Sequence, residues 1–202
     1  VCSSDLLGGS DGIVNIFEAG SFQKHAALQG HESTIRMFSW SNDGQWLASG
    51  DWDGTVRIWE VGSFREHAVL QEDTIDSIEN LPINLEKLKC DLCWITSFPK
   101  LPNTLRELYC SYCNIRNLPT LPLSLQKLDC NHCNRLEKLP NLENNLSLTE
   151  LDCSGCNRLE KLPNLPSSLL YLNFSSCVKI TKLPDMKHIN FYQLKCEFCD
   201  SL

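Results

Sequence analysis

Cysteine is the side chain that offers this sequence the most chemistry, with 12 cysteines in 202 residues. Cys93 and Cys110 enclose sixteen residues between two C-x-x-C pairs, which fits the spacing of a zinc ribbon. So many cysteines also suit a disulfide scaffold. Ten of the twelve form such pairs, which are Cys90 and Cys93, Cys110 and Cys113, Cys130 and Cys133, Cys153 and Cys156, and Cys196 and Cys199.

A repeat dictates the spacing of these pairs, so the zinc-like interval carries little extra information. Phe174 takes the first position of one further pair with Cys177, and a position that accepts Phe is a hydrophobic slot. Stacked parallel strands would hold Cβ atoms about 4.8 Å apart, which is wide for a disulfide. We therefore expect a ladder of reduced core thiols, with metal and disulfide as alternatives. Its members are Cys90, Cys93, Cys110, Cys113, Cys130, Cys133, Cys153, Cys156, Cys177, Cys196 and Cys199.

The repeat itself begins at Leu85 and reads L-x-x-L-x-C-x-x-C-x-I-x-x-F-P-x-L-P. Its segments are spaced by 20, 20, 23, 21 and 22 residues, and their leading leucines are Leu88, Leu108, Leu128, Leu151, Leu172 and Leu194. This unit resembles the leucine-rich repeat, and its short period and LPxLP tails resemble those of bacterial effector and giant-virus repeat proteins. The resemblance implies a solenoid of six rungs over residues 85–202. It implies parallel strands on the concave side and polyproline-like returns on the convex side. The residues expected to point inward in the first rung are Leu85, Leu88, Cys90, Cys93, Ile95 and Phe98.

Residues 7–71 carry a different repeat, with a period of 42. GIVNIFEAGSFQKHAALQ from Gly12 recurs as GTVRIWEVGSFREHAVLQ from Gly54, and the Asn-Asp-Gly and Asp-Gly turns between short runs predict antiparallel strands. This stretch resembles the WD repeat, with one full blade and the last two strands of an earlier one. The resemblance gives His31, Ser49, Asp53 and Trp59 the positions of a structural hydrogen-bond network. A nucleophilic triad is the alternative, but no nucleophile elbow accompanies these residues.

The expected fold class is therefore an all-β repeat protein, a partial WD-type β-propeller followed by a leucine-rich-repeat solenoid. Residues 72–84 are expected to be a linker or a degenerate capping rung. A propeller needs 4 to 8 blades, so residues 7–71 are interpreted as a propeller fragment and the solenoid as truncated. The first six residues, VCSSDL, are interpreted as a non-native artefact, so Cys2 is given no role.

Charge and hydropathy exclude several classes of partner. The net charge of −7 leaves no basic excess to neutralise a phosphate backbone, so we expect no nucleic acid. No stretch approaches the roughly 20 apolar residues of a membrane span, so we expect no membrane. No signal pattern opens the sequence, and a cytoplasmic, reducing location is the expectation.

The exposed positions of the concave strands are the candidate binding site, because packing fixes the inward ones. Their mixed charges and two tyrosines suit a protein or peptide partner. We predict a non-catalytic scaffold or adaptor that is not an enzyme and needs no cofactor or metal. The effector resemblance leaves an alternative, the recognition portion of a ubiquitin ligase whose catalytic domain is missing from this chain. The candidate binding residues are Lys87, Lys89, Glu107, Tyr109, Lys127, Asp129, Glu150, Asp152, Tyr171, Asn173, Gln193 and Lys195.

Overall fold

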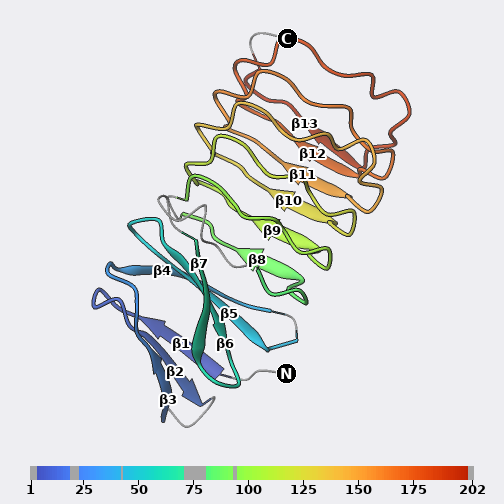
Figure 1. Ribbon diagram of the computed structural model, residues 1–202. Coiled ribbons are helices and arrows are strands. Elements are labelled where there is room, and N and C mark those ends of the chain that lie inside the picture. The colour runs from blue at the N-terminus through green and yellow to red at the C-terminus, as the bar shows by residue number, and fades with distance from the viewer. Residues whose placement is uncertain (1–3, 19–22, 42, 71–80, 93–94, 200–202) are drawn as a thin grey trace.

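The computed structural model describes residues 4–18, 23–41, 43–70, 81–92 and 95–199, which form strands, turns and extended segments. Their strands make three sheets, two small antiparallel ones and one parallel sheet of six strands. The antiparallel sheets lie at one end of the stack that carries the parallel sheet (Figure 1). Within these ranges, no helix is long and apolar enough to cross a bilayer. The all-β repeat architecture is confirmed.

The earlier blade has three strands, where the sequence predicted two. They are β1 (Ser4–Gly8), β2 (Val14–Glu18) and β3 (Lys24–Leu28), paired antiparallel in that order. Strand β1 starts inside the stretch interpreted as non-native, and its backbone pairs with β2 from Ser4–Glu18 to Gly8–Val14. The period of 42 explains the position, because Ser4 lies 42 residues before the first residue of β5 in the next blade. The non-native origin of residues 1–6 stays a prediction.

The complete blade follows the strand order of the sequence. Its strands are β4 (Ile35–Trp40), β5 (Trp46–Asp51), β6 (Val56–Glu60) and β7 (Arg65–Leu70). Alternate residues of the sheet point to opposite faces, so neighbours such as Leu47 and Ala48 enter different cores. One core joins the two blades through Val14, Ile16, Leu28, Ile35, Leu47 and Trp59.

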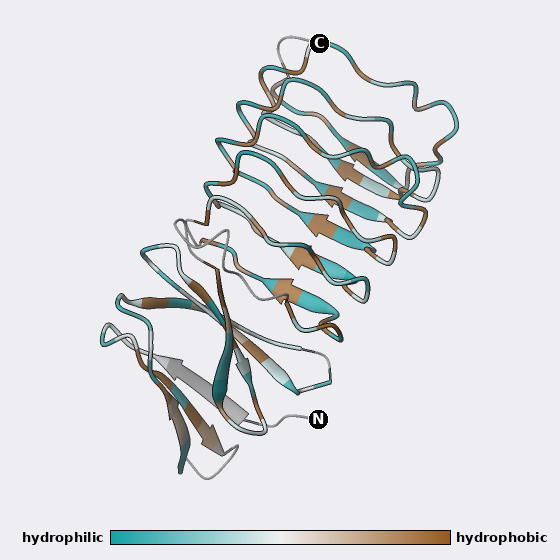
Figure 2. Cartoon of the chain, in the orientation of Figure 1, coloured by the Kyte–Doolittle hydropathy of each residue, from teal (hydrophilic) through white to brown (hydrophobic). Residues whose placement is uncertain are grey.

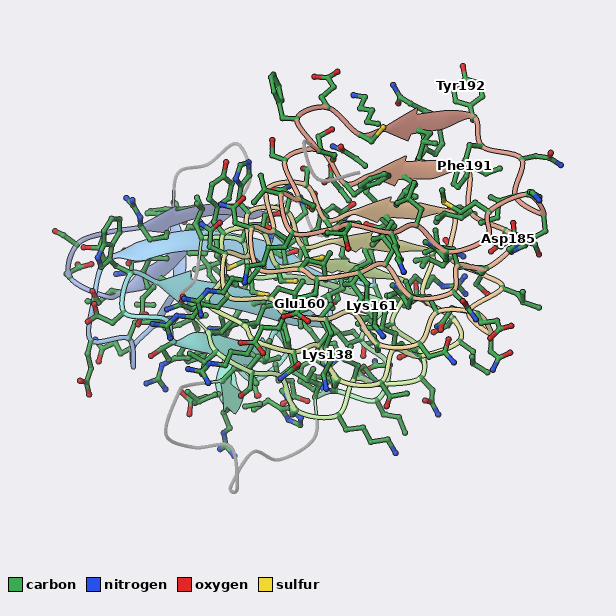
Figure 3. All side chains as sticks on the ribbon, turned by 90° about the horizontal axis from the view of Figure 1, so that it is seen from above. Lys138, Glu160, Lys161, Asp185, Phe191 and Tyr192 are labelled. Atoms are coloured by element: carbon green, nitrogen blue, oxygen red, sulfur yellow. The ribbon has the colours of Figure 1, made fainter. Side chains whose placement is uncertain are left out.

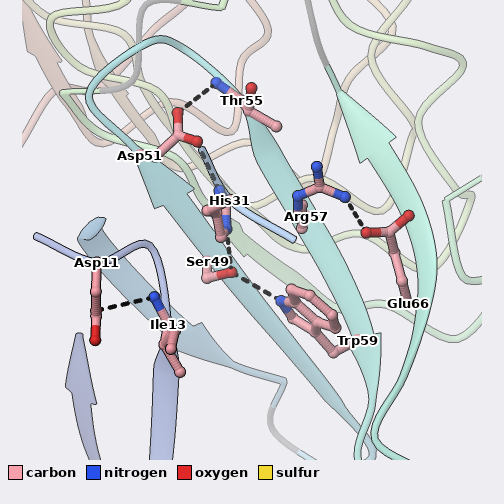
Figure 4. A network of polar contacts seen from close by, with 9 residues as sticks. All are labelled: Asp11, Ile13, His31, Ser49, Asp51, Thr55, Arg57, Trp59 and Glu66. Carbon is pink, nitrogen blue, oxygen red and sulfur yellow. Dashed lines mark hydrogen bonds and ion pairs between the residues drawn. The ribbon is translucent and has the colours of Figure 1, made fainter. Parts of the chain in front are cut away.

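A buried hydrogen-bond network ties the strands of this blade together (Figure 4). His31 Nδ1 lies 2.8 Å from Asp51 Oδ2, and His31 Nε2 lies 2.7 Å from the Ser49 hydroxyl. The indole N–H of Trp59 donates to the same hydroxyl at 2.8 Å. A Ser, a His and an Asp thus align as in a triad, but the hydroxyl is fully buried and already engaged by Trp59. The arrangement is structural.

The acidic member of this network is Asp51, and the prediction of Asp53 is wrong. Asp51 is buried at the end of β5, where its other carboxylate oxygen accepts the Thr55 backbone N–H at 2.9 Å. Asp53 lies two residues later, in the turn before Gly54, and is exposed to solvent. Burial raises the pKa of Asp51, but the hydrogen bonds from His31 and Thr55 outweigh burial and leave that pKa lowered.

The parallel sheet supplies one three-residue strand to each of six rungs. The strands are β8 (Lys87–Lys89), β9 (Glu107–Tyr109), β10 (Lys127–Asp129), β11 (Glu150–Asp152), β12 (Tyr171–Asn173) and β13 (Gln193–Lys195). Their central leucines stand in register, and all but Leu194 are buried. Hydrophobic and hydrophilic residues accordingly recur at matching places from rung to rung (Figure 2).

The solenoid begins before Leu85, within the stretch expected to be a linker or a degenerate capping rung. Leu81 and Pro82 are buried, and the Leu85 N–H donates to the Pro82 carbonyl at 3.0 Å. The same turn recurs where Leu105 donates to Pro102. Residues 81–84 therefore belong to the solenoid, and residues 72–80 lie outside the described residues. In the predicted inward set, Leu85, Leu88, Cys90, Ile95 and Phe98 are buried, and Cys93 is outside the described residues.

The return of the third rung buries every third residue. In the third rung the buried series is Cys133, Leu136, Leu139, Leu142, Asn145 and Leu148. A repeat of three matches the three residues per turn of polyproline II and leaves two outward positions between inward ones. This spacing explains how a rung of about 20 residues builds a core without a helix.

The blade covers the open end of the first rung. Trp46 donates its indole N–H to the Asn84 side-chain oxygen at 2.8 Å, and the Asn84 amide donates to Asp43 at 3.3 Å. Ala48 and Ile58 belong to the same hydrophobic core as Leu85 and the leucines of the following rungs. The two repeat types therefore share one continuous core.

Candidate functional site

The structure places all twelve predicted binding residues at the first and third positions of strands β8 to β13. The central leucine between them is buried in β8 to β12 and exposed in β13, so the first and third side chains of each strand face solvent. We call this surface the concave face. The parallel register sets its side chains in rows, with corresponding residues of neighbouring rungs next to each other.

Opposite charges alternate along the first row and form ion pairs. Lys87 Nζ lies 2.7 Å from Glu107 Oε2, and Lys127 Nζ lies 2.6 Å from Glu150 Oε2. Burial raises the pKa of Glu107, but hydrogen bonds from Lys87 and Tyr109 outweigh it and lower the pKa overall. The hydrogen bond with Glu150 raises the pKa of Lys127. The pairs favour the charged forms of Glu107 and Lys127 and hold the long side chains in place.

Tyr109 lies at the centre of a group of lysines. The ammonium groups of Lys87, Lys89 and Lys127 lie 5.2, 4.8 and 5.5 Å from its ring centroid. Its hydroxyl donates to Glu107 at 3.0 Å. Burial and the Glu107 carboxylate raise the pKa of Tyr109, so the phenol stays neutral. Cation–π contacts on the ring and a hydrogen bond at its tip fix this aromatic side chain before any partner arrives.

Two carboxylates stand side by side in the second row. Asp129 and Asp152 are register partners on β10 and β11, and neither forms an ion pair with another described residue. Neutral donors hold them instead, since Asp129 accepts the Ser111 hydroxyl at 2.9 Å and Asp152 accepts the Asn173 amide at 3.0 Å. They line a hollow of about 270 Å3 over β10 to β13.

The sequence did not single out Tyr192, which extends this face. Its ring centroid lies 5.3 Å from that of Tyr171, and 81% of Tyr192 is exposed. Its place in the repeat could have indicated this position, because Tyr192 directly precedes strand β13. The equivalent residues of the first three rungs are Glu86, Arg106 and Gln126. The two tyrosines form an aromatic edge beside the hollow.

The cysteine ladder is a set of hydrogen-bond donors. The thiol of Cys113 donates to the Cys90 carbonyl at 3.0 Å, and that of Cys133 donates to the Cys110 carbonyl at 3.0 Å. Cys156 and Cys177 repeat the contact one rung further each time. A small thiol thus both fills the core and supplies a donor to the rung before it.

The pKa values of three fully buried thiols, those of Cys110, Cys130 and Cys153, lie well above the ordinary value, whereas the hydrogen bond with Cys153 lowers the pKa of Cys177. The neighbouring Cys133 thiol, and then burial, raise the pKa of the Cys110 thiol well above its ordinary value. Thiolate is the form that binds metal or attacks a disulfide. Among the residues that the structure describes, no three His, Cys, Asp or Glu side chains are grouped so that they could hold a metal ion.

The C-terminal end of the ladder differs from the prediction of a uniform core. Cys196 is exposed and Cys199 partly buried, because no described rung covers the sixth one. The other described members of the ladder are buried. Phe174 stands at a cysteine position of the repeat and is itself fully buried. Cys2 lies outside the described residues, as does Cys93.

Comparison with known families separates the two halves. A family model described as "WD domain, G-beta repeat" matches residues 22–60. A second, described as "Leucine Rich repeats (2 copies)", matches residues 123–167. The chain joins a WD repeat to leucine-rich repeats. Both types of repeat generally mediate protein interactions and are typically non-catalytic.

Comparison with whole proteins gives a similarity over part of the chain. No curated protein matches this WD and leucine-rich-repeat sequence. Among solved structures, it is similar to the β-propeller domain of Cps50 (Swd1) from Myceliophteria thermophila, at 24% identity and a TM-score of 0.34. That similarity covers 35% of this chain and 22% of the other.

Proposed function

We propose that the chain is a non-catalytic scaffold or adaptor whose concave face binds a segment of another protein. The observation that carries the proposal is Tyr109, an aromatic side chain fixed among three lysines on a rigid sheet. Tyrosine is enriched among the residues that dominate binding energy, and fixed side chains lose little entropy when a partner binds.

The remainder of the face supports a polar, mixed-charge partner. The charged side chains of the first row already form ion pairs, whereas Asp129 and Asp152 have only neutral donors among the described residues. A basic side chain of a partner that entered the hollow would meet both carboxylates, with Tyr171 beside it. The acidic net charge of the chain argues against nucleic acid in this place.

The test is affinity capture with matched variants of the full chain. Wild type, the double variant Tyr109→Ala/Tyr171→Ala, and Trp52→Ala would be immobilised and compared by quantitative mass spectrometry. Trp52 is a control because it is an aromatic residue of the blade that is 48% exposed. We expect specific partners to be lost with the double variant and kept with the control. Partners lost only with Trp52→Ala would move the binding site to the blade and contradict the proposal.

We also infer that the chain works in a reducing compartment. The support is that the ladder thiols act as S–H donors, a role that a disulfide would abolish. Thiol titration in denaturant of protein taken from its native source is the test, and blocked ladder cysteines would contradict the inference. The ubiquitin-ligase alternative stays a prediction, and sequencing the neighbouring reading frame tests it.

A further inference from the structure

A second surface, on the return side of the third to fifth rungs, concentrates positive charge. Two stacked rows of exposed cations define what we call the basic flank, which consists of Arg135, Lys138, Arg158, Lys161, Lys179 and Lys182. The members of one row each follow the central leucine of their rung by seven residues, and these are Arg135, Arg158 and Lys179. The members of the other row follow it by ten residues, and these are Lys138, Lys161 and Lys182. Only Glu137 and Glu160 interrupt the rows, so this flank is basic in a chain whose net charge is −7.

In this region, backbone hydrogen bonds hold the third rung against the second and the fourth rung against the third. The Glu137 N–H donates to the Arg116 carbonyl at 3.1 Å, and the Glu160 N–H donates to the Glu137 carbonyl at 3.3 Å. Lys138, Glu160 and Lys161 accordingly lie together, apart from Phe191 and Tyr192 at the start of β13 (Figure 3). Neighbouring members of a row are therefore separated by about one rung, roughly 4.8 Å.

Among the described residues, no member of the basic flank forms an ion pair, although Glu137 and Glu160 lie between the rows. The ion pairs of the solenoid lie on or beside the concave strands. Like charges on neighbouring strands repel each other. A bound anion would relieve that repulsion, so the arrangement favours an acidic ligand.

A groove with both apolar and polar walls opens within the flank, over the returns of the third to fifth rungs. Lys161 and Lys182 border this hollow of about 480 Å3. Its apolar lining is Leu162, Pro163, Leu183 and Pro184, and its polar lining is Asn141 and Asn164. Leu183 is 39% exposed there, although the corresponding leucines of earlier rungs are buried. Exposed Leu183 and the two prolines beside two lysines suit a ligand that carries both carboxylates and an apolar side chain.

We propose that the basic flank binds a short acidic segment of a partner protein, with one apolar side chain of that segment seated in the groove. The length of the flank favours a peptide over a nucleic acid, because three rungs span only about 10 Å from first to last. Glu137 and Glu160 between the rows also oppose a continuous polyphosphate. This surface is separate from the concave face, and the inference does not depend on the proposed function.

The test uses fluorescein-labelled peptides and the full chain, with binding followed by fluorescence anisotropy. The probe is EELEELEE, compared with QQLQQLQQ, which lacks the charge, and EESEESEE, which lacks the apolar side chains. The flank variant is Lys161→Glu/Lys182→Glu. The control is Lys24→Glu/Arg65→Glu, which changes the net charge equally at exposed positions of the two blades.

We expect EELEELEE to bind more tightly than both comparison peptides, and its affinity to fall as salt is raised. The flank variant should lose about tenfold or more in affinity, and the control should stay within about twofold. Failure of EELEELEE to bind, or equal binding by the flank variant, overturns the proposal. Tighter binding of a single-stranded oligonucleotide or of phosphatidylserine vesicles would assign the flank to another class of partner and also overturn it.

Discussion

Removing one thiol of the ladder tests whether the cysteines are donors as well as core. Cys133 is fully buried, and its thiol donates to the Cys110 carbonyl at 3.0 Å. In Cys133→Ala, loss of the donor leaves a buried carbonyl unsatisfied, at about 1–3 kcal/mol. Loss of an apolar group the size of a methylene adds about 0.8 kcal/mol. We therefore expect the free energy of unfolding to fall by about 2–4 kcal/mol.

Two further variants separate the donor from the volume. Cys133→Ser keeps a donor at the same place, so it should destabilise less than Cys133→Ala. Cys196→Ala changes an exposed thiol and should stay within about 0.5 kcal/mol of wild type. The assay is urea unfolding of the full chain in reducing buffer, followed by circular dichroism. Our reasoning is refuted if Cys133→Ala unfolds like wild type, or if the serine variant is the less stable of the two.

Three other predictions concern the turns, the blade and the junction between the repeats. Gly155→Ala should lower stability by about 1–3 kcal/mol in thermal unfolding, because Gly155 has a φ of 67° and its new Cβ would lie 2.5 Å from His132 Nδ1. The lowered pKa of Asp51 means that its carboxylate stabilises the fold above an unfolded pKa of about 3.9, and that this contribution is lost as pH falls through the folded pKa. Urea titrations at several pH values should show that loss in wild type and a flatter profile in Asp51→Asn. A double-mutant cycle of Trp46→Phe with Asn84→Ala should give a coupling energy of about 0.5–1.5 kcal/mol in the same urea assay. Additive losses of unfolding free energy would show that the junction hydrogen bond does not contribute to stability.

The repeats made most of the fold predictable from the sequence. A constant period fixes which leucine faces which, so the register of β8 to β13 follows once the rungs are aligned. The same logic explains the buried Phe174. Strand β1 could also have been placed, because the period of 42 maps it onto β5.

Other features depend on side-chain directions that spacing alone does not supply. Asp51 and Asp53 are both plausible members of the blade network, and only the course of the chain at the end of β5 buries the first and exposes the second. The three lysines around Tyr109 converge through the conformations of long side chains from several rungs. Hydrophobic pattern identifies such positions as exposed but not as neighbours.

The junction of blade and solenoid bears on how blades could be arranged around this one. A propeller blade packs against a neighbour on each of its two faces. Here one face meets the earlier blade through Leu47 and Trp59, and the other meets the first rung through Ala48 and Ile58. The second face has no room for another blade while the rung occupies it. A ring of blades that includes this one is therefore interrupted at this face, because the first rung takes the place of the next blade, whatever the number of blades elsewhere.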